Sequence, residues 1–203
     1  MSQGECVVYV LDDDRRLREA LIALLSSMGK RVVTFGNAGD FLGFERADVP
    51  SCLILDLQLP GMTGLSLLQE LGRIGGPPVI ILTGHGDIPS SVEAIRAGAI
   101  DYLAKPLDAE ILLSAIDRAI RLDRELRSRN AEYLSIKQGY DRLTPRERDV
   151  MPYIVAGRLN KQTADELGTS EITVRIHRAR IMRKMKAESL AHLVRMAMRL
   201  GIF

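Results

Sequence analysis

The chain lacks a hydrophobic run long enough to cross a lipid bilayer, although 46% of its 203 residues are hydrophobic. A membrane-spanning helix needs about 20 consecutive apolar residues, and the apolar runs of this sequence are far shorter. The N-terminus also lacks the basic segment and the long apolar segment of a secretory signal peptide. We therefore expect a cytoplasmic protein that has no membrane partner.

Cysteine is scarce, because the chain contains only Cys6 and Cys52. Both stand at the start of an apolar run of strand length, where a small buried thiol is common. We predict structural roles for both residues, with a redox role as the alternative. The hydrophobic content is sufficient for a core that forms without disulfides.

A large net charge is also absent, but the formal value of +2 hides a difference between the two parts of the chain. Residues 1–141 carry 15 Lys and Arg against 20 Asp and Glu, a net charge of −5. Residues 142–203 carry 13 against 6, a net charge of +7. An acidic first part joined to a basic second part indicates that only the second part meets a polyanion.

Five short apolar runs alternate with helix-like segments over the first part of the chain. The strand-like runs are Val7–Leu11, Val32–Thr34, Cys52–Leu55, Val79–Thr83 and Tyr102–Ala104. The helix-like segments are Leu17–Met28, Ala38–Glu45, Leu65–Ile74, Pro89–Ala97 and a helix that follows Asp108. This alternation predicts a parallel sheet that is covered by helices on both faces.

Polar side chains stand at four of these strand ends. The stretch "VYVLDDD" places Asp12 and Asp13 after the first strand, and "CLILDLQLPGMTG" places Asp56 at the end of the third. "VIILTGHGD" places Thr83 at the end of the fourth strand, and "DYLAKP" places Lys105 after the fifth. Because the carboxyl ends of parallel strands meet at one edge, we expect these side chains to lie together.

Three neighbouring carboxylates repel one another unless a divalent cation lies between them. Mg²⁺ suits such a site, because it takes a few protein oxygens and keeps water and phosphate oxygens for the rest. The metal would make Asp56 a nucleophile toward a phosphoryl group, which Lys105 and Thr83 would then contact. Taken singly, each residue is more often a solvated loop, cap or surface residue, but their order at successive strand ends favours a site.

Helices alone are predicted beyond the fifth strand. Asp108 is a suitable N-cap for a helix whose polar end, residues 123–141, is typical of a helical linker. Thr144 and Glu147 then have the spacing of a capping box at the start of the next helix. Pro152 is expected to kink or end that helix, because proline has no N–H group to donate. Four short helices are expected from there to the end of the chain.

The basic end of the chain contains a helix, a glycine turn and a second helix. Gly168 ends a short helix from Lys161 to Leu167, and Ser170 caps the helix that follows. The second helix has core residues at Val174, Ile181 and Met185 and basic residues at Arg175, Arg178, Arg180, Arg183 and Lys184. A major groove accepts one helix, so this segment is predicted to bind DNA.

The acidic strand ends resemble the receiver domain of two-component response regulators. The matching stretches are "VLDDD", "LILDLQLPGMTG", "ILTGHGD" and "AGAIDYLAKP", and the likeness covers about residues 5–122. The resemblance implies an α/β domain of the flavodoxin-like, doubly wound type, whose five parallel strands lie in the order 2-1-3-4-5.

By this resemblance Asp56 is the phosphoacceptor, and Asp12 and Asp13 hold Mg²⁺ together with it. The backbone carbonyl of Gln58 would complete the protein ligands of the metal. Asp14 falls outside the two acidic positions of the family, so we expect it to face the first helical turn or the solvent.

The same resemblance assigns phosphate-binding and switch roles to Thr83, Tyr102 and Lys105. Tyr102 occupies the position of an aromatic residue whose ring moves inward when Thr83 is drawn to the phosphate. A half-buried strand residue without that role is the alternative for Tyr102. The bond between Lys105 and Pro106 is expected to be cis, which an X–Pro bond allows at low cost.

The basic segment resembles the LuxR-type helix-turn-helix of the FixJ/NarL response regulators over about residues 142–203. Its matching stretches are "LTPRE", "NKQTADEL" and "TVRIHRARIMRKM", and "TGHGD" in the first part favours the FixJ side. By this resemblance Lys161 and Thr173 contact backbone phosphates. The residues that would face bases or adjacent phosphates are Arg175, Ile176, Ala179 and Arg180.

Two other positions of this segment depend on the same resemblance. His177 is expected to support packing or a phosphate contact rather than catalysis. Thr163 stands where the family usually has an apolar β-branched residue, which predicts a small loss of core contact.

Together the two resemblances predict a response regulator with a receiver (1–122), a helical linker (123–141) and a DNA-binding domain (142–203). A sensor histidine kinase would phosphorylate Asp56 with the help of Mg²⁺. The phosphorylated chain would form a homodimer, bind double-stranded promoter DNA and act on transcription through the transcription machinery. Because the receiver takes the phosphoryl group onto its own side chain, we do not expect an enzyme.

Two alternatives belong to other classes of function. A Mg²⁺-dependent phosphohydrolase typically needs a second acid two residues after its nucleophile, where this chain has Gln58. A binding module that acts without phosphorylation would not need the set formed by Asp56, Thr83 and Lys105. Turnover of a phosphate ester would favour the first alternative, and failure to take phosphate from acetyl phosphate would favour the second.

Overall fold

The structure is a computed structural model that describes residues 5–84 and 88–202. The chain divides into two compact units, Met1–Arg127 and Ser128–Phe203. Within the described residues, no helix has both the length and the apolar character that crossing a membrane requires.

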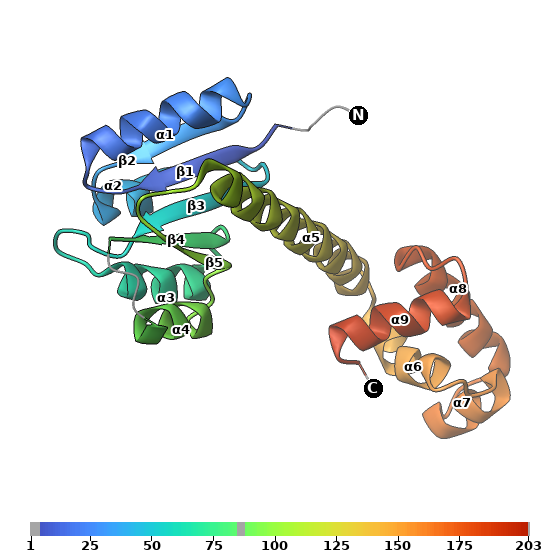
Figure 1. Ribbon diagram of the computed structural model, residues 1–203. Coiled ribbons are helices and arrows are strands. Elements are labelled where there is room, and N and C mark those ends of the chain that lie inside the picture. Colours follow the sequence, from blue (N-terminus) through green and yellow to red (C-terminus); the bar gives the residue numbers. More distant parts are fainter. Residues whose placement is uncertain (1–4, 85–87, 203) are drawn as a thin grey trace. The chain divides into compact units, whose positions relative to one another are not determined.

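The first unit contains a five-stranded parallel sheet in the order β2-β1-β3-β4-β5 (Figure 1). The strands are β1 (Val7–Leu11), β2 (Arg31–Phe35), β3 (Ser51–Asp56), β4 (Val79–Thr83) and β5 (Asp101–Ala104). All five predicted strands are present, and their bounds differ from the prediction by no more than one residue at each end. The predicted fold class and strand order are confirmed.

Helices cover both faces of this sheet. They are α1 (Arg15–Ser27), α2 (Ala38–Gly43), α3 (Gly64–Ile74), α4 (Ile88–Arg96) and the first part of α5 (Ala109–Asp141). Alternate residues of β1 point to opposite faces: Tyr9 packs in the cluster that includes α2, α3 and α4 residues, whereas Val8 packs with α1 and α5. The central strands β1, β3 and β4 are buried along their whole length, as a sheet between two helical layers requires.

The start of α1 depends on Asp14, whose carboxylate accepts hydrogen bonds from the N–H groups of Arg16 and Leu17. This cap lets the helix begin two residues before the predicted start at Leu17. It also agrees with the expectation that Asp14 faces the first helical turn. The loop between β1 and α1 is therefore short and closely tied to the helix.

Helix α5 is unbroken over 33 residues and includes the whole of the predicted linker. Asp108 caps it by accepting from the N–H groups of Glu110 and Ile111, as predicted. Asp123 is buried in the first unit, where its carboxylate accepts from the N–H group of Ser51. Helix α5 therefore still packs with the first unit at Asp123, one residue beyond the predicted end of the receiver at residue 122.

The second unit is built from helices only, over its described residues 128–202. After the end of α5 follow α6 (Pro145–Val155), α7 (Asn160–Leu167), α8 (Glu171–Lys184) and α9 (Leu190–Leu200). Thr144 and Glu147 form the predicted capping box at the start of α6. The four predicted short helices are confirmed.

Pro152 does not end α6, which continues to Val155. Ile154 and Val155, which follow the proline, are buried in the core of this unit. Their burial stabilises a last turn that propensity alone disfavours. Of the two outcomes expected for Pro152, a kink or an end of the helix, the structure excludes the end.

Candidate functional site

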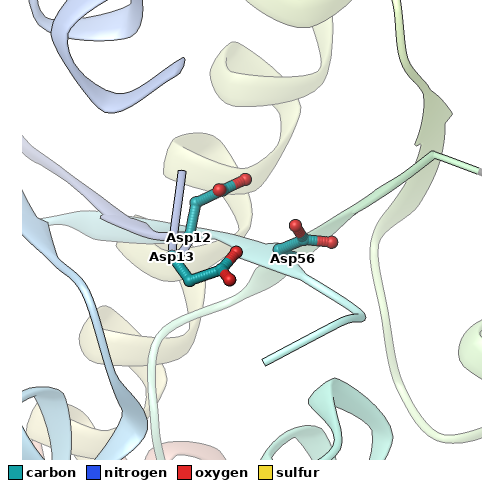
Figure 2. Close-up of side chains that lie close together, drawn as sticks. All are labelled: Asp12, Asp13 and Asp56. Carbon is teal, nitrogen blue, oxygen red and sulfur yellow. The ribbon is translucent and has the colours of Figure 1, made fainter. Parts of the chain in front are cut away.

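The carboxyl ends of the strands bring the predicted acidic residues together. Asp12 and Asp13 follow β1, and Asp56 is the last residue of β3. Each of the three offers a carboxylate oxygen, and these atoms all lie within 4.8 Å of one another (Figure 2). The sheet order places β1 and β3 side by side, so two adjacent strand ends create this acidic cluster.

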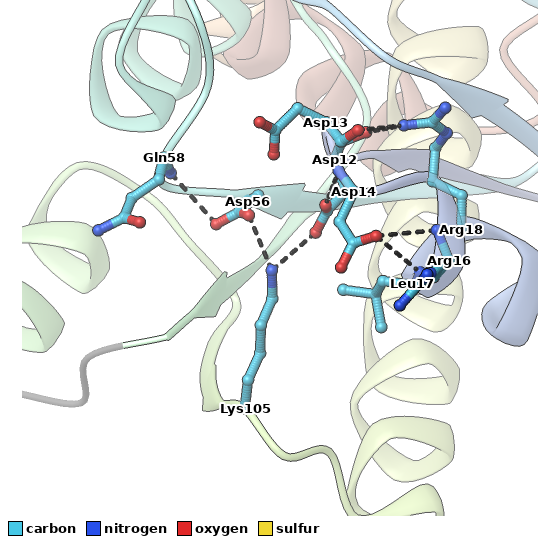
Figure 3. Close-up of polar contacts among 9 residues, drawn as sticks. All are labelled: Asp12, Asp13, Asp14, Arg16, Leu17, Arg18, Asp56, Gln58 and Lys105. Carbon is cyan, nitrogen blue, oxygen red and sulfur yellow. Dashed lines mark hydrogen bonds and ion pairs between the residues drawn. The ribbon is translucent and has the colours of Figure 1, made fainter.

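Lys105 reaches the same cluster from the loop after β5. Its Nζ atom lies 2.8 Å from Oδ2 of Asp12 and 2.8 Å from Oδ2 of Asp56 (Figure 3). The remaining oxygen of Asp56 accepts a hydrogen bond of 3.1 Å from the backbone N–H of Gln58. The Asp56 carboxylate is thus held on both sides, and the residue as a whole is only 5% exposed.

Burial and pairing shift the pKa values of this cluster. Burial of the Asp12 carboxyl raises its pKa, and the hydrogen bonds from Lys105 and from the N–H of Asp14 offset only part of that rise. For Lys105, burial alone would lower the pKa, but hydrogen bonds to Asp12 and Asp56 outweigh it, so the pKa is raised. The charged form of Lys105 is therefore favoured, whereas burial disfavours the charged form of Asp12.

The donor set fits a hard divalent cation. The atoms of the cluster are oxygens only, and three ionised carboxylates beside one ammonium leave a formal charge of −2. Mg²⁺ prefers oxygen ligands and needs only a few from the protein. Asp12, Asp13 and Asp56 are the residues that would hold it.

The remaining residues predicted for the first unit lie near this edge. Thr83 is buried at the end of β4, and its carbonyl accepts from the N–H of Lys105 at 2.7 Å. Tyr102 is half-buried on β5 and packs against the cluster on the α2–α4 face. The bond between Lys105 and Pro106 is cis, as expected. Residues 85–87 of the "TGHGD" stretch lie outside the described residues.

The helix-turn-helix of the second unit is formed by α7, Gly168 and α8. Gly168 adopts the left-handed conformation, with φ 61°, and so ends α7. Ser170 caps α8 by accepting from the N–H of Thr173. Thr163, predicted to weaken the core, is buried, and its hydroxyl donates to the carbonyl of Leu159.

Helix α8 has a buried face and an exposed face. Val174 and Ile181 are buried, and Met185 follows them into the core, as the spacing predicts. The four residues predicted to face bases or adjacent phosphates are all exposed: Arg175, Ile176, Ala179 and Arg180. Lys161 on α7 is exposed too, and Thr173 is half-buried.

Ile172 is a residue of this exposed face that the sequence analysis missed. It is 61% exposed in the first turn of α8, and Ile176, one turn later, is 45% exposed. The two apolar side chains share a face because they are four residues apart. An isoleucine four residues before a predicted base-facing residue is the signal that could have identified it.

Lys184 lies elsewhere than the sequence analysis implied. It was grouped with the basic residues of a helix predicted to bind DNA, but its ammonium pairs with the buried carboxylate of Glu147. His177 is half-buried, and its Nδ1 atom is buried without a hydrogen-bond partner among the described residues. The ion pair of Lys184 therefore leaves fewer free positive charges on α8 than its sequence indicates.

Comparison with known proteins agrees with this arrangement of two units. Residues 8–117 match the response regulator receiver domain, and residues 141–197 match the bacterial regulatory proteins of the luxR family. The chain therefore belongs to the two-component response regulators that carry a receiver domain and a LuxR-type DNA-binding domain. This is a family of transcriptional regulators rather than of enzymes.

Named relatives cover almost the whole chain. Nodulation protein W of Bradyrhizobium diazoefficiens is 44% identical over 202 residues, which are 99% of this chain and 89% of the relative. The response regulator TodT of Pseudomonas putida is 44% identical over 98% of this chain and 88% of its own length. The transcriptional regulatory protein FixJ of B. diazoefficiens is 40% identical over 96% of both chains.

Two solved structures are similar over nearly the full length. The response regulator StyR matches with a TM-score of 0.86 and 41% identity, covering 97% of this chain and 100% of that one. Full-length FixJ from B. japonicum matches with a TM-score of 0.56 and 38% identity, covering 100% of both chains.

Proposed function

We propose that Asp56 accepts a phosphoryl group from a sensor histidine kinase and that this step controls the DNA-binding domain. The observation that carries the proposal is the convergence of Asp12, Asp13, Asp56 and Lys105 at one edge of the sheet. Asp56 is held by Lys105 and by the N–H of Gln58, and unlike Asp12 it is not completely buried.

In the proposed transfer, a carboxylate oxygen of Asp56 forms a bond to the phosphorus of a phosphohistidine. The bond from phosphorus to the imidazole nitrogen breaks, and its electron pair stays on the imidazole of the kinase. Lys105 would exchange one of its carboxylate contacts for a phosphoryl oxygen, as a mobile point charge can. Thr83, at the neighbouring strand end, would donate its hydroxyl to another phosphoryl oxygen.

Asp12, Asp13 and Asp56 would hold Mg²⁺, with the backbone carbonyl of Gln58 as a further ligand. When bound, the metal supplies positive charge that offsets the repulsion between the carboxylates and the incoming phosphoryl oxygens. The side chain of Gln58 is not a carboxylic acid, so the second acid of a phosphohydrolase is missing at that position.

The output of the switch is proposed to be sequence-specific binding of double-stranded promoter DNA by a phosphorylated homodimer in the cytoplasm. Tyr102 would connect the phosphorylated edge to the face formed by β5 and its flanking helices. On the DNA-binding side, Lys161 and Thr173 would contact phosphates. Bases or adjacent phosphates would be met by Arg175, Ile176, Ala179 and Arg180. The transcription machinery would then be the partner of the DNA-bound dimer.

We propose residues 1–122 as the receiver, 123–141 as the linker and 142–203 as the DNA-binding domain. The proposed linker lies entirely within helix α5. Its first residues belong to the first compact unit, and the rest belong to the second.

Incubation with acetyl phosphate and Mg²⁺ tests the proposed chemistry directly. Intact-mass measurement should show one added phosphoryl group on the wild-type chain and none on Asp56→Asn, because an amide is a poor nucleophile. Asp14→Asn is a matched control, since it also removes a carboxylate from the same loop but keeps an N-cap residue. Labelling of Asp56→Asn at the wild-type rate would place the acceptor elsewhere.

A further inference from the structure

The guanidinium of Arg18 contacts the loop that carries Asp12 and Asp13. Arg18 lies in the first turns of α1, and its side chain reaches back toward the N-terminus, the direction in which helical side chains lean. Its Nη1 atom donates to the carbonyl of Asp12 at 2.5 Å and to the carbonyl of Asp13 at 3.0 Å (Figure 3). One guanidinium therefore binds both peptide groups that flank the Cα atom of Asp13.

The three carboxylates of the cluster differ in the number of hydrogen bonds that they accept. Asp12 accepts from Lys105 and from the N–H of Asp14, and Asp56 accepts from Lys105 and from the N–H of Gln58. The Asp13 carboxylate is exposed, and no described residue donates a hydrogen bond to it. Its position near the other two therefore depends on its backbone.

That backbone is fixed from two sides. The N–H of Asp12 donates to the carbonyl of Phe35, and the N–H of Asp14 donates to the carboxylate of Asp12. The carbonyls of Asp12 and Asp13 are bound by Arg18. Without the guanidinium, both peptide groups around Asp13 would lose the partner of their carbonyl oxygen.

We propose that Arg18 is a positioning residue for the divalent cation of the acidic cluster. By binding the two peptide groups around Asp13, it holds that carboxylate where a cation shared with Asp12 and Asp56 would lie. A carboxylate that is already in place loses less conformational freedom when the cation binds. Groups that orient metal ligands typically contribute about 10- to 100-fold in metal affinity, and the low end is expected for one exposed ligand of three.

The positive charge of Arg18 would by itself have the opposite effect on metal affinity. The direction in which the metal affinity changes when Arg18 is replaced therefore tests the proposal. A guanidinium close to the cluster repels a divalent cation, so its removal would strengthen binding if charge alone mattered. Loss of positioning weakens binding instead. A role in the stability of α1 alone would change the thermal midpoint without metal and leave the metal affinity unchanged.

The test compares Arg18→Met with Arg18→Lys and with Arg16→Met in the full chain. Arg16→Met is the matched control, because it removes the same charge from the same helix, and the carbonyls of Asp12 and Asp13 accept from the side chain of Arg18 rather than from that of Arg16. Mn²⁺ affinity is measured by electron paramagnetic resonance, with Mg²⁺ as competitor, beside a thermal melt without metal. Arg18→Met should raise the dissociation constant about tenfold, Arg16→Met should leave it close to the wild-type value, and Arg18→Lys should lie between them.

A second readout is the Mg²⁺ concentration that half-saturates labelling by acetyl phosphate. It should rise in Arg18→Met, while the rate at saturating Mg²⁺ stays near that of the wild-type chain. Unchanged or tighter metal binding by folded Arg18→Met would overturn the proposal, and Arg18→Lys carries the test if Arg18→Met does not fold. The inference rests on the proposed function: failure of the wild-type chain itself to bind Mn²⁺ would overturn both, whereas equal binding by all variants would overturn the inference alone.

Discussion

The ammonium of Lys184, at the end of α8, lies 2.6 Å from the carboxylate of Glu147 in the first turn of α6. The same carboxylate oxygen accepts from the backbone N–H of Thr144 at 2.8 Å. Glu147 therefore joins the start of one helix to the end of the helix that is proposed to enter the major groove. Although Lys184 is basic and lies on that helix, its charge is paired with Glu147 within the same domain.

Lys184→Met should destabilise the DNA-binding domain by about 3 kcal/mol, because it leaves a buried carboxylate without its cation. The slope of log affinity for DNA against log salt concentration should stay at the wild-type value, since no phosphate contact is lost. Arg183→Met is the control, because the neighbouring side chain is exposed and its removal leaves Glu147 paired. A smaller salt slope with unchanged stability would show instead that Lys184 contacts a phosphate.

The pH dependence of stability should also show the effect of the ion pair between Lys184 and Glu147. Burial alone would raise the pKa of Glu147, but hydrogen bonds from Lys184 and Thr144 outweigh it and lower the pKa. A carboxyl with a lowered folded pKa contributes stability that is present above its unfolded pKa of about 4.3 and is lost as the pH falls through the folded value. Thermal melts of Glu147→Gln should therefore show a weaker loss of stability in acid than melts of the wild-type chain.

The sequence was sufficient for the fold because the central strands are apolar on both faces and several helices begin at a side-chain N-cap, such as Asp14 and Thr144. The strand bounds and the Thr144 capping box needed only local information. Lys184 could not be assigned in the same way, because sequence gives the sign of its charge but not a partner 37 residues away. The acidic cluster was predictable from the order of strand ends, whereas the contact of Arg18 with two carbonyls depends on side-chain direction that no motif encodes.

Asp12→Asn should stabilise the protein in the absence of metal. Burial raises the pKa of Asp12, so its contribution to stability is present below its unfolded pKa and is lost as the pH rises through the folded value. An amide at this position carries no charge, so its burial costs no stability when the pH rises. The amide oxygen can still accept from the N–H of Asp14. The variant should also lose the stabilisation by Mg²⁺, which for the wild-type chain is about 2.7 kcal/mol at 100 times the dissociation constant. Melts with and without Mg²⁺ measure both effects, and an equal response of the two proteins to Mg²⁺ would contradict the prediction.

Ile95→Glu should weaken the phosphorylation-dependent dimer without affecting labelling of the chain. Ile95 on α4 is 49% exposed, and Ile111 on α5 is also exposed, so the helices that flank β5 present apolar side chains. A carboxylate at the centre of such an interface would be desolvated without a partner, which should weaken the dimer roughly tenfold or more. Sedimentation after treatment with acetyl phosphate measures this.

Met28→Glu is the control for that experiment, because Met28 is 54% exposed but follows α1 instead. It should dimerise like the wild-type chain. Equal dimerisation of Ile95→Glu and Met28→Glu would exclude the face around β5 as the interface.

The two helices of the DNA-binding motif should separate affinity from specificity. Lys161 is exposed in the first turn of α7, where it can reach a phosphate but not the edge of a base. Lys161→Met should weaken binding to the true site and to random DNA alike. The salt slope should fall by about one, because one fewer counterion is released.

Arg175→Ala should behave differently, because Arg175 is exposed in the early part of α8, where a guanidinium can donate two hydrogen bonds to one guanine. The loss on the true site should be about 1–3 kcal/mol, and the loss on random DNA should be far smaller. Titration of both variants against both DNAs at several salt concentrations measures these quantities, with each variant as the control for the other.

If Arg175→Ala weakens binding to both DNAs equally and lowers the salt slope, Arg175 binds a phosphate. Base reading would then depend on Arg180 and on the apolar pair Ile172 and Ile176, whose exposed side chains can contact thymine methyl groups.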